Sequence, residues 1–374
     1  MTENLLLGKY GVLQAENVEK IRRSWQVKTL LEKYLCKHEK NGGLCVAYCG
    51  HVHKPKIAGE FSVIDFCRGD GGGVHVVGNV HCNRVWACPL CSCVIQCRRA
   101  EILRECIIDW CSIRKNSCMM VTLTYRGNKK YLLKDLIERF SLARKYFFEQ
   151  RQVKEYFNRI SLCRCYCLEM TVSDRNGWHV HVHILFFLFY RNVDSEDVKK
   201  FVYSIWYPCL VRVGLDCDYD HGVDVLSSMD YAEYITKMSG ELSLGNVVKI
   251  GRTSHFTPFQ LILDGSRWAL SMFDEYYDST FGRNALVFSR GMKKFFNVDD
   301  SEDVNEYEKQ MDVEFSLCNA EYENLTYVQK AFLASNVSKE EKMEYMIENN
   351  IRLFDLDDYL LTKNIYDMNN AFAL

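Results

Sequence analysis

The sequence predicts an α+β fold, in which a central, mainly antiparallel sheet is flanked by helices, with a zinc-bound segment before it and an acidic helical tail after it. Three observations predict this fold: two alternating stretches joined through Asn-Gly, cysteines at metal-ligand spacing before them, and a strongly acidic C-terminal stretch. The chain has 374 residues, 48% hydrophobic and 26% charged, enough for two or three globular domains. Fibrous and wholly disordered classes are excluded.

Charge is divided unevenly along the chain although the total is only −2. Residues 297–374 carry 18 acidic and 6 basic side chains, so the preceding 296 residues have a net charge of +10. A basic body has the sign that a polyanion-binding protein requires, although many enzymes carry a similar excess.

No segment has the length of a membrane helix. The longest unbroken apolar run is 184–190, against the roughly 18–20 residues that a span needs. The N-terminus, Met1-Thr2-Glu3-Asn4, lacks a basic segment before a long apolar one. We therefore expect a cytosolic protein, in the cytoplasm of its host, with no membrane partner.

Periodicity gives the order of the elements. Helical spacing of apolar residues recurs at 15–35, 97–114 and 133–158, and a β-branched and apolar run at 119–125 predicts a strand. The composition shift near Asn297 is the clearest boundary. We expect four regions: an N-terminal helical region at 1–60, a cysteine-rich segment and basic helix at 61–114, a domain built on the main sheet at 115–296, and an acidic helical tail at 297–374, with a helix near 339–349.

Eighteen cysteines are many for an intracellular chain, where thiols are more often metal ligands or small core residues than disulfides. One group has metal-ligand spacing, because Cys88-Pro89-Leu90-Cys91 is a tight turn that can aim two thiolates at one ion. Cys67 and Cys82 can complete a tetrahedron, which predicts a structural Zn²⁺ site. The open alternatives are four ordinary buried cysteines or a different set of ligands, drawn from His75, His81, Cys93 and Cys97.

The most informative stretch is a predicted β-hairpin. Residues 163–172 and 178–190 read as strands, and Asn176-Gly177 in the turn is a pair favoured in hairpins. His179, His181 and His183 recur with period two, so all three project from one face, while the opposite face is apolar. Imidazoles buried side by side suit a divalent ion, and the alternative is a hairpin with solvated or core histidines.

Register decides whether the first strand contributes to that site. If Val172 faces Trp178, Glu169 lies directly opposite His181 and completes a His-His-carboxylate set with open positions for substrate. A slip of one residue would turn Glu169 to the other face. Cys163, Cys165 and Cys167 share the face of Glu169, and we interpret them mainly as small core residues.

A further helix is expected at 228–238. It would place Asp230 and Tyr234 four residues apart on one face, with Lys237 about one turn beyond. A free tyrosine has a pKa of about 10, so a phenolate nucleophile near pH 7 has a deficit of roughly 4 kcal/mol that a nearby ammonium and carboxylate can narrow. Taken alone, such a helix is usually only a surface helix.

Together these segments resemble the rolling-circle replication initiator (Rep) proteins of bacterial plasmids and phages, members of the HUH endonuclease superfamily. The resemblance covers residues 60–295, and its motifs stand in the order of the family. These motifs are Cys67-Arg68, Cys82 and Trp86-Ala87-Cys88-Pro89-Leu90-Cys91 with Arg98-Arg99, then Val121-Thr122-Leu123-Thr124, Leu168-Glu169-Met170-Thr171, Asn176-Gly177-Trp178-His179-Val180-His181-Val182-His183, Tyr234-Ile235-Thr236-Lys237, Lys249-Ile250-Gly251-Arg252, Thr257-Pro258-Phe259, Glu275-Tyr276 and Phe288-Ser289-Arg290-Gly291.

The resemblance implies a role for each site residue. His181 and His183 become the paired histidines and Glu169 the acidic ligand of a catalytic Mg²⁺ or Mn²⁺, with His179 as an auxiliary. Tyr234 becomes the nucleophile that nicks one DNA strand, leaving a 5′-phosphotyrosyl end and a free 3′-OH, and the motif includes Lys237. Many relatives have a Glu that activates water at the position of Asp230. The side chain of Asp230 is shorter, so Glu233 is a substitute for this role. Tyr231 is a rival nucleophile that lacks the spacing to lysine.

The implied partners are single-stranded or hairpin origin DNA, with a host helicase and polymerase; the oligomeric state is left open. For the tail, contact with a helicase, dimerisation and simple solubility are the alternatives. An HUH transposase or relaxase would use the same chemistry. A non-catalytic, zinc-containing nucleic-acid-binding protein is the alternative from another class.

Overall fold

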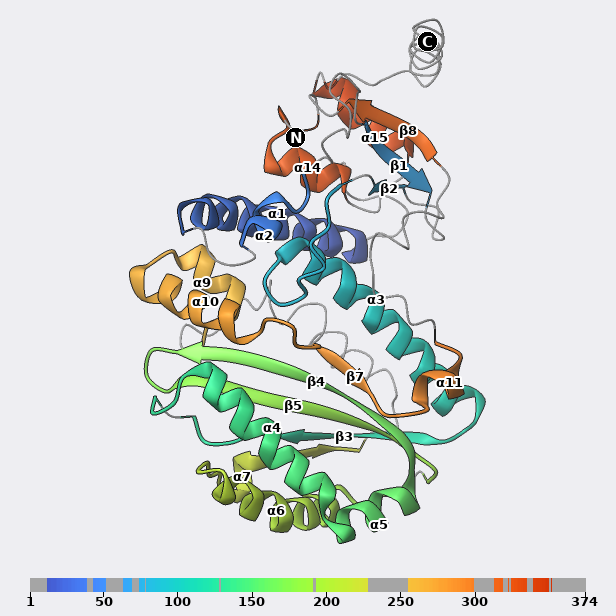
Figure 1. Cartoon of the computed structure of the whole chain (residues 1–374). Helices are drawn as coiled ribbons and strands as arrows, with labels where there is room; N and C mark the ends of the chain where they lie inside the picture. The colour runs from blue at the N-terminus through green and yellow to red at the C-terminus, as the bar shows by residue number, and fades with distance from the viewer. Residues whose placement is uncertain are drawn as a thin grey trace, which may run out of the picture. The chain divides into compact units, whose positions relative to one another are not determined.

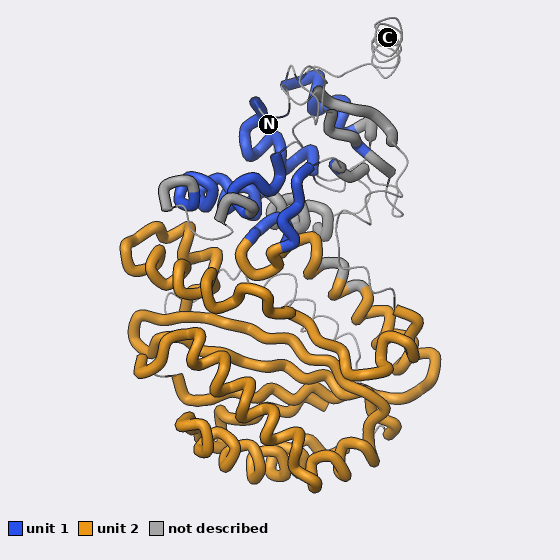
Figure 2. Tube along the Cα trace, in the orientation of Figure 1, with its two compact units in different colours: residues 1–83, 88–91, 301–374 blue, residues 84–87, 92–300 orange. Residues whose placement is uncertain are grey.

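The computed structural model describes residues 12–38, 43–51, 63–68, 74–77, 79–127, 129–190, 193–227, 255–298, 313–318, 322, 324–334, 339–349 and 351. The chain groups into two compact units (Figure 2). Unit 1 comprises residues 1–83, 88–91 and 301–374, and unit 2 comprises residues 84–87 and 92–300. Among the described helices, none is long and apolar enough to cross a membrane.

Unit 2 is built on a five-stranded antiparallel sheet with the strand order β6-β3-β5-β4-β7. This arrangement confirms the predicted α+β class with a mainly antiparallel sheet flanked by helices (Figure 1). β5, which carries the three histidines, is the central strand. The strands are β3 (Ser117–Leu123), β4 (Ser161–Ser173), β5 (Gly177–Leu188), β6 (Val223–Leu226) and β7 (Leu286–Phe288).

The long β4–β5 hairpin has the register on which the site prediction depends. Val172 pairs with Trp178, and Glu169 pairs with His181. Gly177, just after the turn, has a φ of 71°, in the left-handed region that glycine tolerates best. The predicted register is therefore confirmed, and Glu169 shares the face of the histidines.

One face of this sheet is covered by α4 (Leu133–Glu149), α5 (Arg151–Ile160) and α6 (Ser195–Arg212). The ring of Phe157 stacks on Phe186 of β5 with centroids 4.1 Å apart, and Trp206 donates a hydrogen bond from Nε1 to the Thr124 carbonyl. We expected one helix over 133–158, but the chain has two, because Gln150 between them adopts an extended conformation. Four shorter helices among the described residues of unit 2 are α7 (Tyr219–Gly222), α9 (Pro258–Asp264), α10 (Arg267–Ser279) and α11 (Met292–Phe296).

The opposite face is apolar at one end, where α3 (Pro89–Ile108) and the π-helix η1 (Asp109–Ile113) pack on it. Trp110 of η1 lies in this core together with Cys165 and Cys167 of β4. Burial raises the pKa of the Cys165 thiol well above its ordinary value. These two cysteines are core residues, as expected, and the histidines occupy the other end of the same face.

Unit 1 contains a small antiparallel sheet with the strand order β2-β1-β8. β8 comes from the acidic C-terminal stretch, for which the sequence predicted only helices. Trp25, Phe66 and Tyr322 lie in the same apolar core, so this stretch contributes to the interior of unit 1. The elements are α1 (Val12–His38), α2 (Gly43–Tyr48), β1 (Val63–Arg68), β2 (Val74–Val77), β8 (Val313–Cys318), α14 (Tyr327–Leu333) and α15 (Lys339–Glu348).

Candidate metal centre and active site

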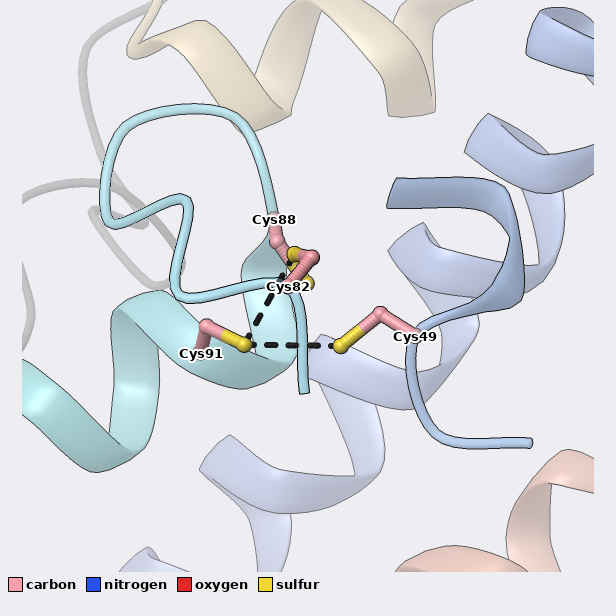
Figure 3. Close-up of side chains that lie close together, drawn as sticks. All are labelled: Cys49, Cys82, Cys88 and Cys91. Atoms are coloured by element: carbon pink, nitrogen blue, oxygen red, sulfur yellow. Dashed lines mark hydrogen bonds between the residues drawn. The ribbon is translucent and has the colours of Figure 1, made fainter. Parts of the chain in front are cut away.

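Four thiols converge in unit 1 (Figure 3). The sulfur atoms of Cys49, Cys82, Cys88 and Cys91 all lie within 4.8 Å of one another, and three of the four side chains are buried. Cys49 Sγ and Cys82 Sγ lie 3.4 and 3.8 Å from Cys91 Sγ. Disulfide sulfurs are about 2.0 Å apart, so these thiols are not bridged.

The spacing of these sulfurs fits a tetrahedral zinc site. With Zn–S bonds of about 2.3 Å, a regular tetrahedron has S···S edges of about 3.8 Å. The thiols therefore need only small shifts to bind an ion. A closed set of four cysteine ligands is typical of structural zinc.

Local chain geometry explains why the thiols meet. Pro89 occupies the first position of α3, where its fixed φ favours helix initiation, so Cys88 lies just before the helix and Cys91 in its first turn. The Gly50 N–H donates a hydrogen bond to the Val80 carbonyl, and the Val80 N–H donates one to the His51 carbonyl. These two bonds hold the segment after Cys49 beside the segment that leads to Cys82.

Two charged residues of α1, Lys28 and Glu32, also hold the segment around Cys49 in place. Lys28 is almost fully buried and donates to the Ala47 carbonyl at 2.7 Å and to Glu32 at 3.1 Å. Burial by itself would raise the pKa of Glu32, but the hydrogen bond with His51 and the charge of Lys28 lower it to about 2. Glu32 is thus an anion at neutral pH, and it anchors His51, two residues after Cys49.

The thiols of the cluster differ in how readily they ionise. Hydrogen bonds with the neighbouring thiols, and burial as well, raise the pKa of Cys91 well above its ordinary value. Burial raises the pKa of Cys88 too, but hydrogen bonds from the other three thiols lower it well below that value. One thiolate can therefore form readily, whereas four close negative charges require a metal ion to balance them.

The cluster differs from the predicted ligand set at one position. Cys82, Cys88 and Cys91 were expected, but the fourth thiol comes from Cys49, where the sequence analysis proposed Cys67. Cys67 lies on β1 opposite His75, and its side chain is outside the part of the chain that the structure describes. The available signal for Cys49 was Gly50 directly after it, whose φ of 83° turns the chain sharply. That glycine lies 32 residues before Cys82, too far to suggest a common site.

The second candidate site is in unit 2, at the end of the sheet that carries the histidines. Glu169 and His183 are largely buried, and His183 Nε2 lies 3.4 Å from Glu169 Oε2. The rings of His181 and His183 are nearly parallel, with centroids 6.2 Å apart. Imidazole and carboxylate ligands beside one another suit a divalent cation such as Mn²⁺, so the donor set fits the expected metal.

This second set is less tightly gathered than the thiols. Within the described residues, the cysteine cluster is the one group of three or more histidine, cysteine or acidic side chains whose ligand atoms all lie within 4.8 Å of one another. Glu169, His181 and His183 exceed that limit, so side-chain rotation must accompany binding of an ion there. Their role as metal ligands stays a prediction.

His179 has a different environment from the other two histidines. Its Nε2 lies 2.8 Å from Thr124 Oγ1 and 2.9 Å from the Tyr125 carbonyl. Burial and the nearby His255 lower its pKa, although the bond to the Tyr125 carbonyl opposes this effect. His179 is thus bound to the backbone, and its auxiliary role at a metal stays a prediction.

The predicted nucleophile and its neighbours lie outside the described residues. Tyr234, Asp230 and Lys237 fall within 228–254, as do Tyr231 and Glu233. The described ends of that stretch are informative. On one side, Asp224 of β6 pairs with Thr122, which in turn pairs with His183.

On the other side, the chain returns beside the hairpin. Phe256 exchanges two backbone hydrogen bonds with Val172, and His255 lies close enough to influence the charge of His179. After residues 228–254 the described chain therefore resumes beside the histidines. Before them it ends just beyond β6, whose last residue, Leu226, pairs with Met120 toward the apolar end of the sheet.

Two curated proteins are similar to this chain. Protein rep from Streptomyces lividans is 24% identical over a match that covers 60% of this chain and 65% of that protein. A neomycin resistance protein from Streptomyces cyanogenus is 23% identical over 36% of each. The chain thus spans less than two thirds of either relative. No family model and no solved structure matches it. The resemblance to Rep proteins that the motifs indicate is confirmed by the similarity to Protein rep.

Proposed function

We propose that this chain is a plasmid-type replication initiator that nicks one strand of origin DNA. The observation that carries the proposal is the register of the β4–β5 hairpin, which brings Glu169 opposite His181 and within 3.4 Å of His183. The similarity to Protein rep supports a role in plasmid replication. The net charge of +10 on residues 1–296 supports a polyanionic partner.

In the proposed reaction, the Tyr234 oxygen attacks a phosphorus of the DNA backbone, and the bond from that phosphorus to the 3′ oxygen breaks. The phenolic proton leaves to a base, for which Asp230 is the candidate, and the departing 3′ oxygen takes up a proton. The products are a 5′-phosphotyrosyl strand and a free 3′-OH that a host polymerase can extend, with a host helicase opening the duplex.

Glu169, His181 and His183 would hold the Mg²⁺ or Mn²⁺, which supplies charge stabilisation to the phosphate in the transition state. The residues of the chain perform the other tasks. Lys237 would favour the ionised form of Tyr234 by its positive charge. Lys and Arg side chains would hold the DNA backbone, and the nicked strand must be single-stranded to reach the nucleophile.

A gel assay tests this proposal. The purified protein is incubated with Mn²⁺ and single-stranded oligonucleotides tiled across the replicon that carries the gene, and the products are separated under denaturing conditions. We expect a protein–DNA adduct that Tyr234→Phe abolishes and that Tyr231→Phe, a matched control three residues away, retains. An adduct lost only in Tyr231→Phe would move the nucleophile to the rival tyrosine.

A second candidate function has a specific observation in its favour. The cysteine cluster is complete without the histidines, as a structural site in a non-catalytic nucleic-acid-binding protein would be. DNA binding without an adduct, across every tile of the replicon, would establish this alternative and exclude the nickase.

A further inference from the structure

Thr122 is the partner of a histidine that the proposed function uses. It lies on β3 directly beside His183 of the neighbouring strand β5, and its side chain is buried. Thr122 Oγ1 is 3.0 Å from His183 Nδ1. The opposite ring nitrogen, Nε2, faces Glu169 at 3.4 Å. His183 is therefore held between a hydroxyl and a carboxylate.

The protons on this ring follow from what its two neighbours can do. An ionised carboxylate only accepts hydrogen bonds, so without a cation Nε2 carries the hydrogen and points it at Glu169. The Thr122 hydroxyl then donates to the lone pair on Nδ1. In this pattern both ring nitrogens of His183 are engaged, Nε2 by Glu169 and Nδ1 by Thr122.

Binding of a cation beside Glu169 requires the opposite pattern. Nε2 must then offer its lone pair, so the single ring hydrogen resides on Nδ1. The Thr122 oxygen can accept from it, because a hydroxyl is both a donor and an acceptor. A backbone carbonyl could satisfy only this second pattern, and a valine could satisfy neither.

His179 on the same strand illustrates the contrast. Its Nε2 lies 2.8 Å from the Thr124 hydroxyl and 2.9 Å from the Tyr125 carbonyl, which accepts only. The Thr124 hydroxyl donates to that same carbonyl at 3.4 Å. The Nε2 hydrogen of His179 is thereby fixed in place. His183 instead has a partner that permits both tautomers.

We infer that Thr122 is a positioning residue that lets His183 change tautomer when a divalent cation binds beside Glu169. This inference rests on the proposed function, because it assigns Thr122 to the same metal set. Loss of the hydroxyl would remove the acceptor that Thr122 offers to Nδ1–H of the metal-bound form. Partners of metal-bound histidines typically contribute about 10- to 100-fold in metal affinity, and we expect Thr122→Val to lose a factor in that range.

The test is a Mn²⁺ titration of the full chain with its cysteine cluster loaded with Zn²⁺, followed by electron paramagnetic resonance of free Mn²⁺. Thr122→Ser keeps the hydroxyl and should retain most of the affinity. Thr124→Val removes the hydroxyl beside His179 and should leave the affinity near that of the unaltered protein. Zinc content, measured in the same samples, should be equal in all variants.

A second measurement guards against misfolding of Thr122→Val. In the unaltered protein, ¹⁵N spectra of the histidine rings should show His183 with its hydrogen on Nε2 without Mg²⁺ and on Nδ1 with it. Unchanged ring signals on addition of Mg²⁺, together with full Mn²⁺ affinity in Thr122→Val, would overturn the inference.

The outcomes separate this inference from the proposed function. If the unaltered protein binds Mn²⁺ through Glu169 and His183 while Thr122→Val binds equally well, Thr122 has no positioning role and the nickase proposal stands. If the unaltered protein binds no Mn²⁺ at the histidines, the catalytic metal site itself is absent and both ideas are contradicted.

Discussion

The cysteine cluster of unit 1 and the histidine face of unit 2 differ in how closely their candidate ligands are gathered. The four thiols lie within 4.8 Å of one another before any ion binds, and backbone bonds at Gly50 and Val80 lock the segments that carry them. Glu169, His181 and His183 share a face and a register but remain more widely spaced. Closed ligand sets are typical of structural zinc, whereas catalytic ions need an open side for substrate.

The site whose candidate ligands come from more chain segments is the one whose ligands are gathered more closely before an ion binds. The thiols come from three separate segments whose positions fix one another. The histidines and Glu169 come from a single hairpin, which sets their order and face. Any further group that contacts a bound ion must come from another part of the chain. The proposed contributor is the stretch that carries Tyr234.

The largest expected effect is the loss of zinc from the closed cluster. Cys91→Ser should lose the bound zinc and the cooperative thermal unfolding of unit 1, because structural zinc contributes about 10–16 kcal/mol of apparent binding energy. Cys93→Ser, two residues along the same helix and outside the cluster, is the matched control. Zinc content by mass spectrometry and melting by calorimetry measure the two effects. Retention of stoichiometric zinc in Cys91→Ser would refute the assignment.

A smaller effect is expected at the open site. Glu169→Gln keeps the shape of the side chain but removes the charge, and we expect Mn²⁺ affinity and adduct formation to fall by about 100-fold or more, beyond the 10- to 100-fold that a metal ligand's partner contributes. Zinc content should not change. His221→Gln, an exposed histidine beside Asp218, is the control and should behave as the unaltered protein. Equal loss of zinc and Mn²⁺ would show that the two sites are not independent.

Gly50→Ala should disturb the backbone that positions Cys49 in the cysteine cluster, without removing a thiol. A Cβ at this position would lie 2.7 Å from Leu90 Cδ1 and 2.9 Å from Trp25 Cη2, and the φ of 83° adds strain. We expect a loss of about 1–3 kcal/mol in the free energy of unfolding, with weaker zinc retention. Gly282→Ala has a similar φ of 70° and nothing within 4 Å of the new Cβ, so it isolates the backbone contribution. Equal effects of the two substitutions would mean that crowding at Gly50 is unimportant.

One buried lysine should give unit 1 a pH-dependent stability. Burial lowers the pKa of Lys342 to about 7 from an unfolded value of 10.5, so between these values the unfolded chain binds more protons and stability rises with pH. Lys342→Met should remove this slope, which is at most about 1.4 kcal/mol per pH unit. Chemical denaturation of both proteins from pH 7 to pH 10 measures the difference. Parallel curves would show that Lys342 is charged and solvated in the folded state.

Local patterns predicted much of unit 2. Alternation and Asn-Gly located the hairpin, and the choice of register followed from pairing Val172 with Trp178, which the structure confirms. The break at Gln150 could not be predicted, because residues on both sides of it continue the helical spacing of apolar side chains.

Unit 1 was harder to predict because its parts come from opposite ends of the chain. β8 pairs with β1 across about 250 residues of sequence, and the acidic composition of its surroundings suggested a solvated tail. Cys49 was missed for the same reason, since only the fold brings it to Cys82 and Cys91. Pairing between distant segments leaves no periodic signal in a single sequence.

Anomalous diffraction from crystals grown with Zn²⁺ and then soaked in Mn²⁺ tests the central claim most directly. Data at the two absorption edges should give a zinc peak among Cys49, Cys82, Cys88 and Cys91 and a separate manganese peak bonded to Glu169, His181 and His183. A manganese signal absent from the histidines, at a soak concentration that supports full occupancy of other Mn²⁺ enzymes, would contradict the account.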